Sequence, residues 1–193
     1  MLTLRTEYWT YKPKFLPSYV FPAMYEIIKE YCKPGTSKKR VSCWFDNIHS
    51  KSSRDNTNIG YGYLPGYSWI DAPSILMEIC KLVEQYTKEK YDYVLVHIYP
   101  DGNSSISWHN DSEAINSSIA SISLGAARKF RLKRIGRKEG WDTELKLTDG
   151  DLVWMHGPDL NTGRPSCQKV YYHTVPVEKT VKEPRINLTF RQY

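Results

Sequence analysis

Two segments in the first half of the chain carry apolar residues at the spacing of an amphipathic helix. Within residues 73–88 the apolar side chains form one stripe: Ile75, Leu76, Ile79, Leu82, Val83 and Tyr86. Residues 22–32 show the same period; Pro22 suits a first turn, and Pro34-Gly35 follows as a stop signal. The pattern predicts two helices, over residues 22–32 and 73–88.

From residue 93 onward the period changes to two or to short apolar runs, which is typical of β-strands. Glycine, proline and aspartate separate several of these runs. We expect strands near residues 93–99, 105–109, 118–124, 128–134, 143–147, 151–155, 168–176 and 185–191. A further strand is expected at 41–45, inside a polar and basic stretch. Helices followed by many short strands predict an α+β fold, a double-stranded β-helix (jelly-roll) core buttressed by two helices from the N-terminal half.

The length of 193 residues suits one domain with a sizeable core and is short for two. We therefore expect a single domain over residues 1–193, with the jelly-roll core over 90–193. No apolar run is long enough to span a bilayer, and the first residues lack the pattern of a secretory signal. The four cysteines are scattered without a C-x-x-C motif. These features predict a protein with free thiols that is intracellular, nuclear or cytoplasmic, and neither secreted nor membrane-bound. We also expect a monomer.

The charge balance is basic, with a formal net charge of +6. This is compatible with a polyanionic partner, of which nucleic acid is the commonest, although many basic proteins bind none. We expect phosphate contacts to come from these basic residues: Lys38, Lys39, Arg40, Lys51, Arg54, Arg128, Lys129, Arg131, Lys133, Arg134, Arg137 and Lys138.

A His-x-Asp pair, His109 and Asp111, follows one of the expected strands. Side chains two residues apart on extended backbone point to the same side, so an imidazole and a carboxylate can converge on one ion. A second histidine, His173, lies on a later strand. Two histidines and one carboxylate are the ligand set of non-haem Fe(II) oxygenases. Alone, the pair is more typical of a solvated loop than of a metal site.

The segment 185–191 alternates strictly between apolar and polar residues. Its polar face carries Arg185, Asn187, Thr189 and Arg191. Burying two arginines is costly without an anionic partner, and a dicarboxylate would match both guanidinium groups. The alternative is an edge strand whose arginines face water. On the strand at 93–99, His97 and Tyr99 share one face, and Tyr99 is either a further carboxylate contact or a core aromatic.

Five blocks of sequence together resemble the AlkB family of Fe(II)/2-oxoglutarate-dependent dioxygenases, most of all its DNA-repair homologues two and three. The blocks come in the family's order and approximate spacing: Tyr99-Pro-Asp-Gly102, His109-x-Asp111-x-Glu113, Ile119–Gly125, Tyr172-His173 and Pro184–Arg191. The resemblance covers the chain from about residue 60 to its end. It implies an enzyme that uses Fe(II), 2-oxoglutarate and dioxygen to remove N-alkyl groups from DNA bases such as 1-methyladenine and 3-methylcytosine, or from RNA.

The resemblance also implies roles for individual residues. His109, Asp111 and His173 would be the catalytic iron ligands. Arg191, helped by Asn187, would bind the 2-oxoglutarate carboxylate nearest the metal. Arg185 would bind the distal carboxylate with Tyr99 and Thr189. The family often has asparagine where this chain has His97, which could still donate one hydrogen bond to the co-substrate.

Substrate recognition is expected to involve a nucleotide-recognition lid within residues 1–70 and a single-stranded or flipped-out base. Tyr61 and Tyr63 resemble the family's base-recognition segment, with Tyr63 stacking on the base; hairpin packing is the alternative. Glu113 matches an acidic residue near the base edge. The family's hydrophobic finger is not reproduced in 40–60, where Val41–Phe45 is a substitute wedge candidate. The segment 157–169 is longer than expected and could cover the pocket.

Two other functions remain open from the sequence. One keeps the fold but moves the chemistry to a protein or small-molecule substrate. The other is a nucleic-acid-binding protein with an inactive iron site, against which the intact His109, Asp111 and His173 argue.

Overall fold

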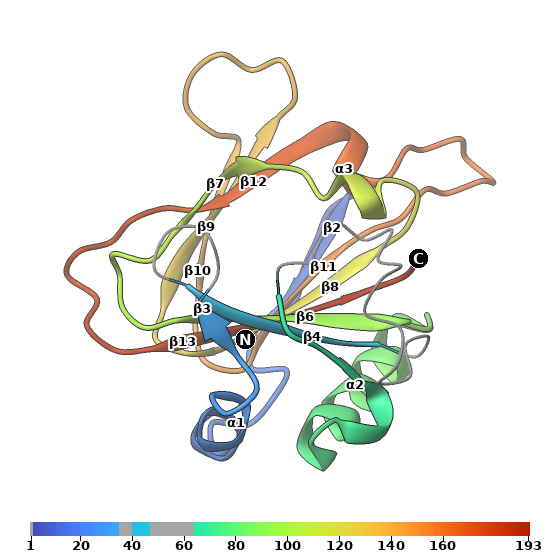
Figure 1. The fold of residues 1–193 in the computed structure, drawn as a ribbon. Helices are drawn as coiled ribbons and strands as arrows, with labels where there is room; N and C mark the ends of the chain where they lie inside the picture. Colours follow the sequence, from blue (N-terminus) through green and yellow to red (C-terminus); the bar gives the residue numbers. More distant parts are fainter. Residues whose placement is uncertain (1, 35–39, 47–63) are drawn as a thin grey trace.

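The computed structural model describes residues 2–34, 40–46 and 64–193. In this part of the chain, two β-sheets face each other and two helices cover the outside of the larger sheet (Figure 1). The larger sheet has the order β1 (Leu4–Arg5), β2 (Trp9–Lys12), β11 (Asp151–Met155), β8 (Ile119–Gly125), β13 (Arg185–Arg191), β6 (Tyr93–Tyr99), β4 (Val41–Asp46) and β3 (Lys33–Pro34), with β5 (Gly66–Ser68) parallel to β4.

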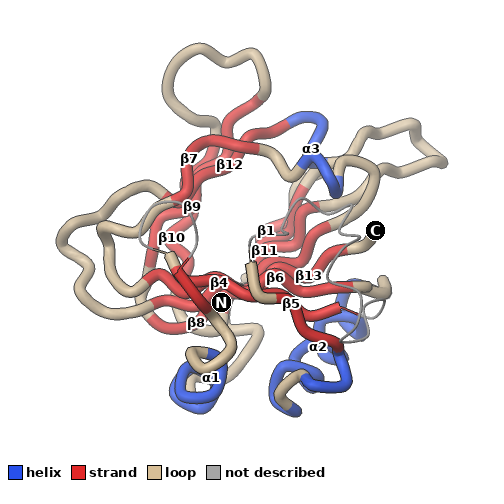
Figure 2. The backbone as a smooth tube through the Cα atoms, viewed as in Figure 1, coloured by secondary structure: helices blue, strands red, loops and turns tan. Residues whose placement is uncertain are grey.

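The smaller sheet has the order β10 (Thr143–Leu147), β9 (Arg128–Arg134), β12 (Tyr171–Val175) and β7 (Ile106–His109). Its pairings are antiparallel, as are those of the larger sheet apart from β4 with β5. Figure 2 shows the two sheets as opposite walls that meet at one side of the molecule. Two facing sheets with mostly antiparallel neighbours agree with the predicted jelly-roll core.

The helices α1 (Val20–Ile28) and α2 (Ser74–Thr87) pack on the apolar outer face of the larger sheet. This face is the main hydrophobic core; its strand residues include Cys43, Phe45, Val94, Val96, Ile98, Ile122, Ile186, Leu188 and Phe190. A second cluster lies between the sheets and joins β2 and β11 to β9, β10 and β12. The remainder of the space between the sheets is lined by polar side chains and forms the site described below.

The structure corrects three expectations about elements. Helix α1 ends at Ile28 instead of residue 32, because Tyr31 leaves the helix to pack its ring 5.3 Å from Phe45 and 5.1 Å from Tyr67. The strand expected over 168–176 begins only at Tyr171, after the short helix α3 (Cys167–Val170). Strands β1 and β2 were not predicted; β2 pairs with β11, a distant part of the chain, and β1 pairs with β2.

The segment Val41–Phe45 is not available as a wedge for a base stack. It forms β4, which lies between β3 and β6, and the side chains of Cys43, Trp44 and Phe45 are buried there. None of the described helices is long and apolar enough to cross a membrane.

Candidate metal and co-substrate site

The inner face of the larger sheet carries a grid of polar side chains. Paired residues on adjacent antiparallel strands point to the same face, so the register defines rows across β8, β13, β6 and β4. One row contains Ser123, Asn187, His97 and Ser42. Arg185 and Tyr99 pair in the next row toward one end, and Arg191 and Tyr93 pair toward the other. The same strands present only apolar residues to the helices.

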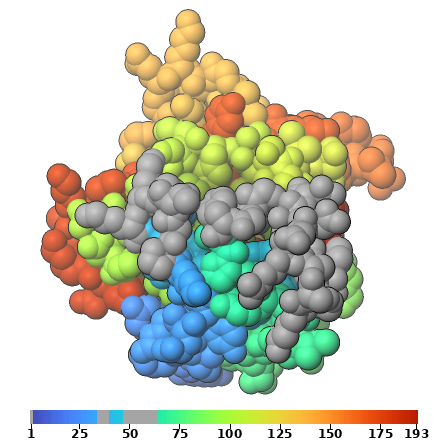
Figure 3. All heavy atoms as spheres, viewed as in Figure 1, coloured from blue at the N-terminus to red at the C-terminus, as the bar shows by residue number. Residues whose placement is uncertain are grey.

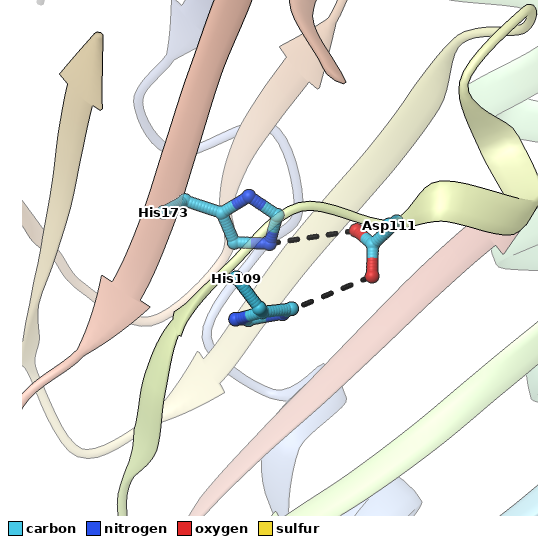
Figure 4. A group of neighbouring side chains, drawn as sticks. All are labelled: His109, Asp111 and His173. Atoms are coloured by element: carbon cyan, nitrogen blue, oxygen red, sulfur yellow. Dashed lines mark ion pairs between the residues drawn. The ribbon is translucent and has the colours of Figure 1, made fainter. Parts of the chain in front are cut away.

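His109, Asp111 and His173 converge on one point from the smaller sheet (Figure 4). His109 ends β7 and pairs directly with His173 of β12, so both imidazoles point into the space between the sheets. Asp111 lies just after β7, before the turn η2 (Ser112–Ala114). Figure 4 shows the three side chains facing one another. The predicted His-x-Asp and the distant histidine therefore form one site.

The geometry of these three residues suits a metal ion. One ligand atom from each lies within 4.8 Å of the other two. His173 Nε2 is 3.4 Å from Asp111 Oδ2, and His109 Nε2 is 3.8 Å from Asp111 Oδ1. Asp111 Oδ2 is buried and has no hydrogen-bond partner among the described residues. An orphaned carboxylate oxygen beside two imidazoles fits Fe(II), which this ligand set binds while leaving positions open.

Electrostatics and burial keep Asp111 and His173 in their metal-binding protonation states. Burial alone would raise the pKa of Asp111, but the Arg191 guanidinium and the two imidazoles hold the pKa at about 2. Burial lowers the pKa of His173 to about 3, although Asp111 acts in the opposite direction. At neutral pH the carboxylate is charged and His173 is neutral, and these are the forms that coordinate a cation.

Arg191 lies at the metal end of the polar grid. Its Nη2 donates to Asp111 Oδ1 at 2.9 Å, and its Nη1 contacts the Glu113 carboxylate. The guanidinium therefore orients a metal ligand directly. Glu113, expected at the base edge, contacts Arg191, and its role at the base stays a prediction.

Arg185 lies at the other end of the grid and is almost fully buried, with 1% of its surface exposed. Its Nη2 donates to Ser123 Oγ at 2.8 Å, and its Cζ lies 5.0 Å from the centre of the Tyr99 ring. Its Nε and Nη1 are buried without a partner among the described residues. Burial lowers the pKa of Arg185 to about 10. A buried cation with unpartnered N–H groups fits an anionic ligand, as its sequence pattern suggested.

Asn187 and Thr189 lie between the two arginines on β13. Asn187 Nδ2 donates at 2.8 Å both to Ser121 Oγ and to the Ile122 carbonyl. The Thr189 hydroxyl donates to the Leu95 carbonyl at 3.0 Å. The described bonds of both side chains therefore hold the strands, and contacts to a co-substrate remain predictions for them.

His97 lies beside Asn187 in the grid, and its Nδ1 is 2.6 Å from Ser42 Oγ. Burial, followed by the charges of Arg40 and Arg191, lowers its pKa well below the ordinary value. The imidazole is therefore neutral at pH 7, with Ser42 fixing its orientation.

One positioning residue, Gln168, was missed from the sequence. Its side chain is 1% exposed, and its Oε1 accepts from the Asp111 backbone N–H at 3.0 Å. Its backbone carbonyl accepts from Asn110 Nδ2 at 3.1 Å. The end of the long 157–169 segment thus holds the His-x-Asp turn in place. No local pattern marks this glutamine, because its partner lies 57 residues earlier.

The structure describes only some of the residues that were expected to contact nucleic acid. Tyr61, Tyr63, Lys38, Lys39, Lys51 and Arg54 lie outside the described residues. Arg128 is 1% exposed and binds Glu178 and the carbonyls of Ser104 and Pro176, so it is a structural residue rather than a phosphate contact.

The β9–β10 hairpin carries most of the remaining expected basic residues. Figure 3 shows it, in golden colours, projecting from one end of the molecule. Two of its cations are paired, Arg131 with Glu144 and Arg137 with Asp142.

The fold and site together define a class of protein: a jelly-roll metalloenzyme with a two-histidine, one-carboxylate centre and a buried anion site beside it. The family model of the 2OG-Fe(II) oxygenase superfamily matches residues 31–191. The chain therefore belongs to the 2OG-Fe(II) oxygenase superfamily, whose members are Fe(II)- and 2-oxoglutarate-dependent enzymes.

Relatives of known function are AlkB homologues, in agreement with the motifs. The DNA oxidative demethylase ALKBH2 of Bos taurus is 31% identical over 156 residues, covering 77% of this chain and 54% of the relative. The alpha-ketoglutarate-dependent dioxygenase alkB homolog 3 of Homo sapiens is 31% identical over 182 residues, covering 86% of this chain and 60% of the relative. The chain thus spans about half the length of the curated relatives it matches.

Solved structures share the fold at low sequence identity. OsALKBH1 superimposes with a TM-score of 0.69 at 15% identity, covering 100% of both chains. A viral collagen prolyl hydroxylase from Paramecium Bursaria Chlorella virus-1 gives a TM-score of 0.60 at 16% identity, covering 97% of each chain.

Proposed function

We propose that this chain removes N-alkyl groups from nucleic-acid bases by oxidation, coupled to decarboxylation of 2-oxoglutarate to succinate. The observation that carries the proposal is the placement of the His109, Asp111 and His173 centre opposite a buried arginine with unpartnered N–H groups. The names of the relatives ALKBH2 and alkB homolog 3 support the demethylase assignment. Nucleic acid is the proposed partner, and the net charge of +6 supports it.

In this proposal each part of the site has one task. His109, Asp111 and His173 hold Fe(II), which with 2-oxoglutarate and dioxygen supplies the oxidation of the alkyl carbon. Arg191 keeps the pKa of Asp111 low and binds the 2-oxoglutarate carboxylate nearest the metal, helped by Asn187. Arg185 and Tyr99 hold the distal carboxylate, with Asn187, Thr189 and His97 along the path between the ends.

The finer parts of the proposal concern the substrate and setting. The base enters the site unpaired or flipped out, because its alkyl carbon cannot reach a buried metal from within a duplex. Tyr61, Tyr63 and Glu113 are the proposed base contacts. We further propose that the protein acts as a monomer inside the cell, in the nucleus or the cytoplasm.

Mass spectrometry of methylated oligonucleotides tests this function. Single- and double-stranded DNA and RNA carrying 1-methyladenine or 3-methylcytosine are incubated with the protein, Fe(II) and 2-oxoglutarate. We expect loss of the methyl group, with formaldehyde and succinate formed in equal amounts, and none of these with Asp111→Ala. Succinate formation driven by a peptide, with no demethylation of any oligonucleotide, would instead establish a protein hydroxylase.

A further inference from the structure

A third arginine, Arg40, stands at the anion end of the polar grid. Val41 pairs with Ile98 across β4 and β6, so the preceding residue lies opposite Tyr99 when the antiparallel register continues. The Arg40 Cζ atom is 5.7 Å from the centre of the Tyr99 ring. Arg185 pairs with Tyr99 from the other side and lies 5.0 Å from the same ring. The two guanidinium groups therefore flank one tyrosine.

Arg40 and Arg185 have unpartnered nitrogens at the same two positions of the guanidinium group. In both residues Nε and Nη1 are buried and have no partner among the residues that the structure describes. Arg128 offers a contrast, because its Cζ is also 5.7 Å from the Tyr99 ring but its nitrogens bind Glu178 and three backbone carbonyls. Burying N–H groups of a cation without acceptors is costly, so two such cations around one tyrosine indicate an anionic ligand near it.

The charge of Arg40 also affects the pKa of His97 in the site. It is the second largest cause of the lowered pKa of His97, after burial and ahead of Arg191. His97 lies in the next row of the grid, where Ser42 of β4 bonds its Nδ1. Arg40, just before β4, and Ser42 within it thus add one cation and one hydroxyl to the polar face formed by β6 and β13.

We propose that Arg40 is a second guanidinium for the distal carboxylate of 2-oxoglutarate, acting with Arg185 from the opposite side of Tyr99. This inference rests on the proposed function, since it assigns a ligand to that site. A carboxylate has enough lone pairs to accept from two guanidinium groups. Decarboxylation leaves the distal carboxylate intact, so Arg40 binds succinate as well as 2-oxoglutarate.

Calorimetric titration tests the assignment without turnover. The full chain is loaded with Mn(II) and titrated with 2-oxoglutarate, succinate and 2-oxopentanoate, which has a methyl group in place of the distal carboxylate. We expect Arg40→Met to weaken the binding of both dicarboxylates about 10- to 100-fold, since a hydrogen bond to a charged group is lost. Binding of 2-oxopentanoate should change less than about 2-fold, and Arg40→Lys should be intermediate because it keeps the charge but not the fork.

A control variant and further measurements distinguish the results that would contradict this proposal. Lys33→Met removes an exposed cation from the neighbouring strand β3 and should change none of the affinities. Unchanged dicarboxylate affinity in Arg40→Met, with weakened binding of a methylated oligonucleotide, would overturn the assignment and make Arg40 a phosphate contact. Equal weakening for all three small ligands would make Arg40 structural, and so would a large drop in thermal unfolding midpoint. Failure of the unaltered protein to bind 2-oxoglutarate would defeat the proposed function itself.

Discussion

The two faces of strands β8, β13, β6 and β4 are built from alternate residues of the same segments yet perform different tasks. The outer face is apolar and packs on α1 and α2. The inner face carries arginine, asparagine, histidine, serine and threonine in register. Both faces are buried, so burial alone does not identify the core. We therefore expect the outer face to contribute most of the stability, whereas the inner face keeps polar groups that need a ligand.

The largest effect on stability is expected on the outer face. Phe190 is fully buried in the main core, and Phe190→Ala should lower the free energy of unfolding by about 3–5 kcal/mol. Thr189→Val, one residue away on the inner face, loses a single hydrogen bond and should cost about 1 kcal/mol. Urea unfolding followed by circular dichroism measures both. Equal losses would contradict the division between the faces.

The largest effect on binding is expected at the metal centre. Asp111→Ala removes the carboxylate that both imidazoles face, and metal affinity should fall by more than about 100-fold, since even residues behind the ligands contribute 10- to 100-fold. Anaerobic titration with Fe(II) measures the change. Asp142→Ala, which removes a carboxylate paired with Arg137 on the outer hairpin, is the control and should leave metal affinity unchanged.

Arg185→Met separates stability from ligand binding. Methionine replaces a buried cation with an apolar chain, so without ligand the free energy of unfolding should stay the same or rise by about 1 kcal/mol. Added 2-oxoglutarate should stabilise the unaltered protein but not this variant. Denaturation with and without 2-oxoglutarate gives the comparison. A loss of more than about 2 kcal/mol without ligand would show that the inner face also supports the fold.

A smaller effect on the free energy of unfolding is expected when the pH is lowered. Burial keeps the pKa of His97 well below its value in the unfolded chain, about 6.5. As the pH falls below about 6.5 the unfolded chain takes up the proton first, so the contribution of His97 is complete above that pH and is lost below it.

The variant His97→Asn isolates this contribution. Its free energy of unfolding should fall less between pH 7.5 and pH 5.5 than that of the unaltered protein. His156, whose pKa is also lowered by burial, is present in both proteins and cancels from the difference. Parallel pH profiles would show that His97 does not cause acid sensitivity.

Much of the site could be predicted because its chemistry follows local periodicity. Alternation over 185–191 separates Arg185 and Arg191 from their apolar neighbours, and the spacing of His109 and Asp111 places two ligands on one side of the chain. The described metal group joins these two to His173, as the sequence predicted. The main helices and most strands also agree with their expected ranges, because long periodic segments carry the strongest signal.

The sequence by itself determined the family, the ligand types and the two-faced strands, since each depends on residues close together in the chain or on motifs in a fixed order. Only the tertiary structure decided which distant groups meet. It brought Gln168 to the Asp111 backbone, paired β2 with β11 and made Arg128 structural. It also placed Arg40 beside the Tyr99 ring, with which Arg185 pairs. Such contacts depend on sheet register between remote segments, which no local pattern encodes.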